Sequence, residues 1–145
     1  MDAADPHDLE RFVAAQAQVW PQVRAELAAG CKRSHWMWFV FPQLRGLGHS
    51  AMATFYGVGS LAEARAYLAH AVLGPRLIEC AQIVAGHADR TAEQIFGGID
   101  AMKLRSSMTL FAEADPGQTV FAEVIETFFA GPDPLTLART AERSG

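Results

Sequence analysis

The chain has 145 residues, of which 50% are apolar and 19% charged, and its net charge is −4. This balance indicates one folded domain over residues 1–145, and it excludes both a disordered chain and a basic protein that wraps nucleic acid. Two cysteines are too few for a disulfide scaffold, the first residues are polar and acidic, and the longest apolar run is far shorter than a membrane span. We therefore expect a cytoplasmic protein with no membrane-embedded part, and flexible ends at 1–6 and 140–145.

Helix signals begin near the start of the chain. Apolar residues recur at helical spacing from Leu9 to Leu27. Pro21 interrupts this pattern and predicts that one helix ends near Val19 and that another begins directly after it. Gly30 is the predicted stop of the second helix.

Capping residues mark the later helices. Ser60 with Glu63, and Thr91 with Gln94, have the spacing at which a hydroxyl and a carboxyl or amide group satisfy each other's backbone N–H groups. The predicted helices run from Ser60 to about His70, from Gly74 to Gly86, from Thr91 to Gly97, from a capping Asp100 to about Ala114, from Val120 to Gly131, and onward from Asp133-Pro134.

The segment HWMWFVF at 35–41 is the one stretch with a trace of the alternation that is typical of a strand. The sequence as a whole favours an all-α, single-domain bundle. A short strand at 35–41 is the alternative to a helix in that segment.

Three motifs identify a family resemblance more specifically than the pattern of predicted helices does. They are GCKRSHWMWFVFPQ from Gly30 to Gln43, GLG at 46–48, and DAMKLRSSMTLF at 100–111. On these motifs the chain resembles the domain-of-unknown-function 1810 family over about Leu9 to Phe129. The resemblance implies a fold without an assigned activity. Members are sometimes labelled calpastatin, but calpain-binding segments are expected in disordered repeats, and this chain has no repeats. Comparison with the small helical NADAR family suggests ADP-ribose or NAD as a ligand type, although the acidic and tryptophan positions of that family do not align with this chain.

Lysine use is strongly biased. The chain has ten arginines but only Lys32 and Lys103, and both lysines lie within the motifs. A compact ammonium suits a phosphate or a carboxylate partner. Asp100, Lys103 and Ser107 share one side of a predicted helix, and Ser106 borders it. A few polar groups on an apolar wall are typical of a ligand pocket. Alternatively, the lysines fall there by chance, and the hydroxyls bond their own helix.

Other candidates flank the aromatic segment. His35 has the chemistry for proton transfer or phosphate contact, and Trp36 for stacking on a base or sugar. Gln43 precedes a loop whose glycines permit close backbone approach to a ligand, and Arg45 and Arg76 are candidate phosphate contacts. The alternatives are a structural histidine, core aromatics and a loop that only turns the chain.

We therefore predict a pocket for a phosphate-bearing, nucleotide-like small molecule. In an enzymatic version, a hydrolase, His35 or Asp100 would move a proton. No metal or cofactor is predicted, nucleic acid is not an expected partner, and the sequence defines no oligomeric state. The predicted ligand contacts of this pocket are Lys32, Trp36, Gln43, Arg45, Arg76, Lys103, Ser106 and Ser107.

The other hypothesis is a non-catalytic structural or protein-interaction domain. The pocket hypothesis loses its main support if the two lysines lie more than about 15 Å apart on separate faces, beyond a Debye length and without a shared cleft.

Overall fold

Helices make up the regular structure of residues 5–143, the part of the chain that this computed structural model describes. Within that range, the only β-type pairing is an isolated bridge between Leu44 and Val58. The predicted all-α fold is thus confirmed. The helices are α1 (Glu10–Ala29), α2 (Met37–Val40), α3 (Ala51–Tyr56), α4 (Leu61–Ala69), α5 (Leu73–Ala85), α6 (Ala92–Phe96), α7 (Gly98–Ala114), α8 (Val120–Phe128) and α9 (Pro134–Arg143).

The expected flexible ends, 1–6 and 140–145, fall partly outside the described residues, which exclude 1–4 and 144–145. The carboxylate of Asp5 accepts hydrogen bonds from the backbone N–H groups of Leu9, at 2.7 Å, and Glu10, at 3.0 Å. At the other end, Thr140 is buried on α9.

Several helix ends lie where their capping residues predict them. Gly30 ends α1 in the left-handed conformation, with φ of 69°. The Ser60 hydroxyl accepts a hydrogen bond from the Glu63 backbone N–H at the start of α4. Thr91 and Gln94 form a complete reciprocal capping box at the start of α6. The structure thus confirms these capping signals. Each one satisfies backbone groups within a single turn, so it depends only on neighbouring residues.

The predicted break at Pro21 is wrong. Helix α1 is continuous, and Pro21 lies inside it on the exposed side. Phe12 before the proline and Leu27 after it are both fully buried in the same core. Burial on both sides therefore holds the helix together despite the backbone hydrogen bond that proline cannot donate.

The strand alternative at 35–41 is also wrong, because Met37–Val40 form the short helix α2. Met37, Phe39 and Val40 are all buried, which removes the alternation between a core face and a solvent face. The expectation that Asp100 caps a helix is likewise incorrect. Helix α7 begins at Gly98 after Gly97, whose φ is 83°, so Asp100 lies in the first turn.

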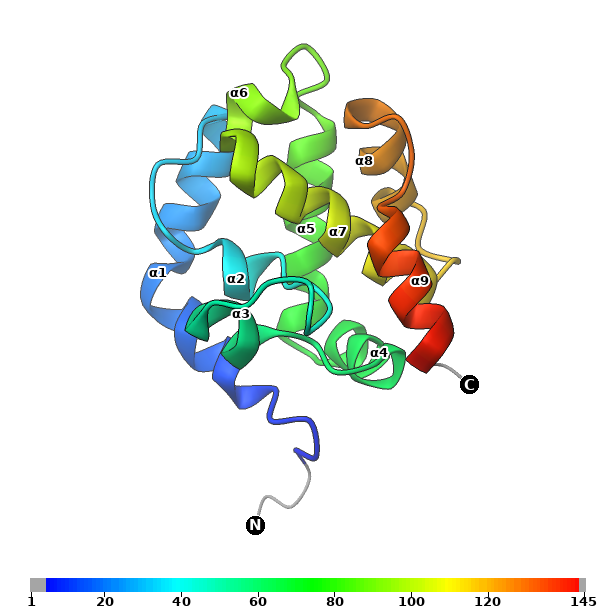
Figure 1. Cartoon of the computed structure of the whole chain (residues 1–145). Coiled ribbons are helices and arrows are strands. Elements are labelled where there is room, and N and C mark those ends of the chain that lie inside the picture. Colours follow the sequence, from blue (N-terminus) through cyan, green and yellow to red (C-terminus); the bar gives the residue numbers. More distant parts are fainter. Residues whose placement is uncertain (1–4, 144–145) are drawn as a thin grey trace.

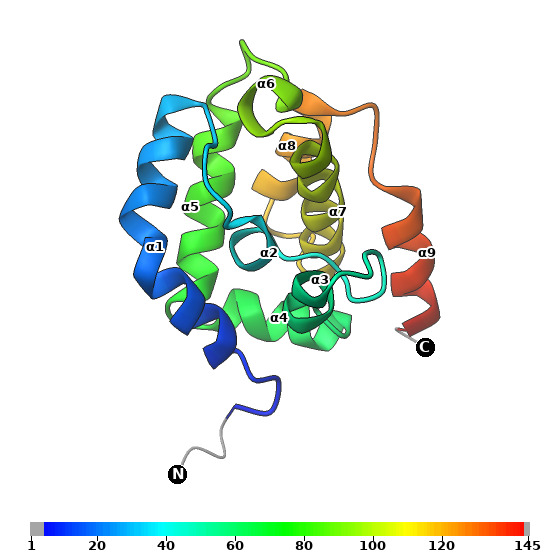
Figure 2. The same cartoon turned by 60° about the vertical axis from the view of Figure 1, so that its left-hand side comes forward.

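Helix α7 lies at the centre of the fold and contacts α4, α6, α8 and α9, while α1 and α5 lie side by side (Figures 1 and 2). Aromatic rings connect these helices through the core. The ring centroids of Phe12 and Tyr67 are 5.1 Å apart, those of Tyr67 and Phe111 are 5.3 Å apart, and those of Phe111 and Phe121 are 5.8 Å apart. This row joins α1, α4, α7 and α8 and fixes the position of α7.

No single helix in the described part of the chain is long and apolar enough to cross a membrane. One pair of helices, Leu61–Ala69 and Leu73–Ala85, meets the length and composition test together, but it is bent by 91°.

Candidate functional site

The carboxylate of Glu26 holds the segment that leads from α1 to α2. It accepts hydrogen bonds from the backbone N–H groups of Arg33, at 2.9 Å, and Ser34, at 3.1 Å, and from the indole N–H of Trp36, at 2.9 Å. The Ser34 hydroxyl also donates to it. Burial raises the pKa of this carboxyl, but the hydrogen bonds outweigh burial and lower the pKa to about 2. The glutamate thus fixes the path of the motif that carries Lys32.

The two lysines meet on one carboxylate. Lys32 Nζ lies 2.8 Å from Asp100 Oδ2, and Lys103 Nζ lies 3.4 Å from Asp100 Oδ1. Lys32 also donates to the Ser34 carbonyl, and its side chain is only 6% exposed. Lys103 is 22% exposed, and its ammonium lies 4.5 Å from the centre of the Trp38 ring. The distance condition on the lysines is therefore met, and Lys103 is the more accessible of the two.

Lys103 lines two adjoining hollows. The narrower one lies between α2 and α3 and includes Trp38, Gln43 and Tyr56. The wider one, which we call the Lys103 groove, lies between the loop at 43–48, α7 and the start of α9; Figure 2 shows this loop reaching toward α9. Its lining includes Gln43, Leu47, Ile99, Met102, Lys103, Arg105, Ser106, Asp133 and Leu135. Gln43 and Lys103 belong to both hollows, so the two form one connected surface.

The groove wall is unusually apolar for an accessible surface. Ile99 is 76% exposed, Met102 is 72% exposed and Leu135 is 66% exposed. Exposed apolar side chains that gather at one place indicate a binding surface more strongly than scattered ones do. Three predicted site residues, Gln43, Lys103 and Ser106, lie in this groove. The hydroxyl oxygen of Ser106 lies 3.2 Å from the Met102 carbonyl oxygen and 3.0 Å from the Asp133 carboxylate, so its one proton can bond to either acceptor, and the contact with Asp133 links α7 to the start of α9.

Two predicted contacts are inside the protein. Trp36 is fully buried, with its indole N–H bonded to Glu26. Ser107 is also fully buried, and its hydroxyl oxygen has no hydrogen-bond partner in the described part of the chain. Both side chains therefore face the core rather than the groove.

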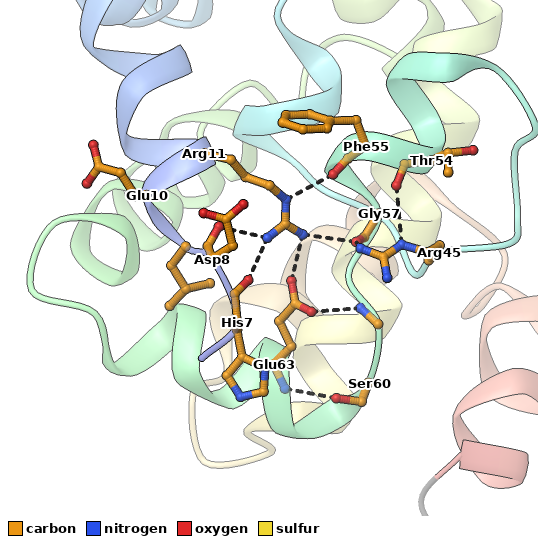
Figure 3. Close-up of polar contacts among 12 residues, drawn as sticks. His7, Asp8, Glu10, Arg11, Arg45, Thr54, Phe55, Gly57, Ser60 and Glu63 are labelled. Atoms are coloured by element: carbon orange, nitrogen blue, oxygen red, sulfur yellow. Dashed lines mark hydrogen bonds and ion pairs between the residues drawn. The ribbon is translucent and has the colours of Figure 1, made fainter. Parts of the chain in front are cut away.

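The remaining three candidates lie apart from the groove or make other contacts. His35 is exposed and makes no hydrogen bond or ion pair with any described residue. Arg76 lies 4.6 Å from the centre of the Trp20 ring and 3.3 Å from the Gln16 side-chain oxygen, which places it against α1. Arg45 donates to the carbonyls of Thr54 and Gly57, as Figure 3 shows.

Figure 3 also shows an ion pair that sequence reasoning did not identify. Arg11 lies 2.8 Å from Glu63, and the two side chains are only 6% and 7% exposed. The guanidinium also donates to four backbone carbonyls, those of His7, Asp8, Phe55 and Gly57. These contacts use its hydrogen-bonding capacity within the fold, which makes the pair a structural connection between α1, α3 and α4.

This geometry defines a helical domain with an accessible ammonium beside an apolar groove. Residues 6–140 match the model of the family described as "Protein of unknown function (DUF1810)". The chain belongs to that family, and the resemblance in its motifs is confirmed. It is similar to the conserved hypothetical protein Rv1873 from Mycobacterium tuberculosis, whose crystal structure is known. The two are 54% identical, the match covers 94% of this chain and 99% of that one, and the TM-score is 0.93. No curated protein matches the chain.

Proposed function

We propose that the Lys103 groove binds a small molecule in which a phosphate or similar anionic group is joined to an apolar or aromatic body, as in a nucleotide. The observation that supports this most is the position of Lys103 on both adjoining hollows, beside Gln43. Two ammonium groups around the single carboxylate of Asp100 leave one net positive charge. That charge attracts an anion, while Ile99 and Met102 offer the apolar wall that ligand pockets use.

The proposal is a binding function, and ADP-ribose and NAD fall within its ligand class. Hydrolysis has less support, because each Asp100 oxygen contacts a lysine and would have to leave an ion pair to accept a proton. His35, the other candidate for proton transfer, has no partner in the described part of the chain that would orient it. We also propose a cytoplasmic location, since both Cys31 and Cys80 are free thiols.

A protein-interaction domain is the second candidate. It is favoured by the exposure of Ile99, Met102 and Leu135 on the same groove. In that case the groove would receive an apolar surface of a partner, and Lys103 would contribute only at its rim.

A thermal-shift screen with nucleotides, ADP-ribose and sugar phosphates tests the proposal. A ligand at a hundred times its Kd stabilises the native state by about 2.7 kcal/mol, which raises the Tm by several degrees. We expect Lys103→Met, which keeps the apolar stem, to lose most of this shift. Arg24→Gln is the matched control, because it removes an equal charge from an exposed ion pair with Glu79.

Two outcomes would refute ligand binding at Lys103. One is that no compound shifts the Tm of the wild-type protein. The other is that Lys103→Met responds as the wild type does. If no compound binds and the wild type associates with itself in a way that Met102→Glu abolishes, the interaction domain is the better account.

A further inference from the structure

The charges around the Lys103 groove are unevenly placed. At the Lys103 end, Lys32 and Lys103 share the carboxylate of Asp100, which leaves one net positive charge. On the side of α9, the groove is lined by Arg105 and Asp133, whose opposite charges balance. Lys103, Arg105 and Asp133 are the charged members of the lining among the described residues. The net attraction for an anion is therefore concentrated at Lys103.

The charged groups on the α9 side are already engaged within the fold. Arg105 donates to the carbonyls of Gly131, at 2.8 Å, and Pro132, at 3.1 Å. The carboxylate of Asp133 accepts hydrogen bonds from the backbone N–H of Thr136, at 3.2 Å, and from the Thr136 hydroxyl, at 2.5 Å. The start of α9 is thus capped by a side chain of the protein, so these donors are not offered to a phosphate.

The size of the groove also limits the ligand. Its volume is about 310 Å³, at the lower end of the range of about 300 to 1,000 Å³ that ligand sites span. The adjoining hollow between α2 and α3 has a volume of about 10 Å³, which is room for about one water molecule. A body of one base and one sugar suits the groove, whereas the second half of a dinucleotide would extend into solvent.

We infer that the Lys103 groove selects a nucleoside monophosphate and gains nothing from a second phosphate or a second sugar; this inference rests on the proposed function. The phosphate contacts the ammonium of Lys103 and the side-chain amide of Gln43, which forms no hydrogen bond within the described part of the chain. The base and sugar pack on the apolar wall of Ile99, Met102 and Leu135. A second phosphate meets no further net positive charge, so it adds nothing to the affinity.

Four ligands that share adenosine test the inference. They are adenosine, AMP, ADP and ADP-ribose, and each is titrated without divalent cations into the full chain labelled with 15N, so that amide chemical shifts report both affinity and position. We expect shifts around the 43–48 loop, α7 and the start of α9. AMP should bind about two- to fivefold more tightly than adenosine, which is the effect of one solvent-accessible charge contact. ADP and ADP-ribose should bind no more than about twofold more tightly than AMP, because their second phosphate meets balanced charges.

A substitution of Asp133 tests the balance of charges on the α9 side. Asp133→Asn keeps an oxygen that can cap α9 but leaves Arg105 without an opposing charge. The ratio of the AMP Kd to the ADP Kd should then rise by about two- to fivefold, because the second phosphate gains one charge contact. Asp89→Asn is the matched control, since this exposed carboxylate lies in the loop between α5 and α6 and does not line the groove. It should leave the ratio unchanged, and the amide spectrum of each variant reports whether it is folded.

Two results would overturn the inference and leave the proposed function standing. One is that ADP or ADP-ribose binds the wild type more than about twofold more tightly than AMP does. The other is that Asp133→Asn leaves the ratio of the two Kd values unchanged. Failure of the proposed function gives a different pattern: none of the four compounds binds, AMP binds no more tightly than adenosine, or Lys103→Met binds AMP as the wild type does. The inference then fails with it.

Discussion

Replacing Glu26 by glutamine should remove a pH-dependent part of the protein's stability. In the native state, hydrogen bonds from Ser34, Arg33 and Trp36 lower the pKa of the Glu26 carboxyl from 4.5 to about 2. A group whose pKa is depressed by folding stabilises the native state above its unfolded pKa, and this contribution is lost as the pH falls through the folded pKa. Lowering the pKa from 4.5 to about 2 corresponds to about 3 kcal/mol at neutral pH. The loss should occur between about pH 5 and pH 2.

The assay is urea denaturation followed by far-ultraviolet circular dichroism, at several pH values from 7 to 2.5. We expect Glu26→Gln to be about 3 kcal/mol less stable than the wild type at pH 7, and the difference to shrink steadily below pH 5. Comparing the two proteins at each pH cancels the titration of all other groups. Glu123→Gln, at an exposed carboxylate, should stay within about 0.5 kcal/mol of the wild type.

Two results would refute the reasoning about Glu26. A difference that stays constant from pH 7 to pH 2.5 would mean that glutamine disturbs packing and that the carboxylate charge is irrelevant. Equal stability at pH 7 would mean that the hydrogen bonds to the 33–36 segment contribute nothing that an amide cannot replace.

Three further substitutions test other contacts by urea denaturation. Arg11→Met leaves the carboxylate of Glu63 buried without its ion pair and should cost about 3–5 kcal/mol; a loss below about 1 kcal/mol would contradict a structural role. Gly74→Ala places a methyl group 2.0 Å from the Leu68 carbonyl oxygen and should destabilise by more than about 2 kcal/mol, so a neutral result would show that the α4–α5 connection yields easily. Ser107→Ala removes a buried hydroxyl without a partner and should be neutral or stabilising by about 1 kcal/mol, whereas a clear loss would indicate an important hydrogen bond there.

Helix ends were predictable from the sequence because their causes are local. The Thr91 hydroxyl and the Gln94 amide satisfy each other's backbone groups within one turn. Gly30 adopts a positive φ next to the helix that it ends. Such contacts require only residues that are close in the chain, so their spacing identifies them.

The two failed predictions of secondary structure have tertiary causes. The propensity of Pro21 to break a helix is real, but burial of Phe12 and Leu27 on either side of it outweighs that propensity. The aromatic segment could not be assigned from its pattern, since Met37, Phe39 and Val40 are all buried. Their positions show clearly neither the helical period of 3.6 residues nor the strand period of two. The helical conformation of this segment is determined by the packing of α2 between α1 and α3.

The candidate site was partly predictable. Lys32, Asp100 and Lys103 stood out because two rare lysines lie in the specific motifs, and the structure brings all three together. Glu26 was missed because the donors that it binds lie in a loop whose path no periodicity describes. Its one local signal was a carboxylate in the last turn of a helix, where the helix dipole disfavours it. The exposure of Met102 was equally hidden, since an apolar residue on a helix ordinarily predicts burial.

The scarcity of lysine also has an architectural explanation. Arg45, Arg90 and Arg105 each donate to two backbone carbonyls in loops or at helix ends. A protein built from short helices leaves many such carbonyls without intrahelical partners, and the planar guanidinium satisfies two at once with donors that are held in a fixed geometry. Arginine in this chain is therefore largely a structural residue. Lys103 differs, because its ammonium contacts a tryptophan ring and the Asp100 carboxylate at the edge of an open groove. A partly exposed lysine that donates to no backbone carbonyl of the described residues is a cation available to a ligand, which is why Lys103 is the residue on which the proposed function depends.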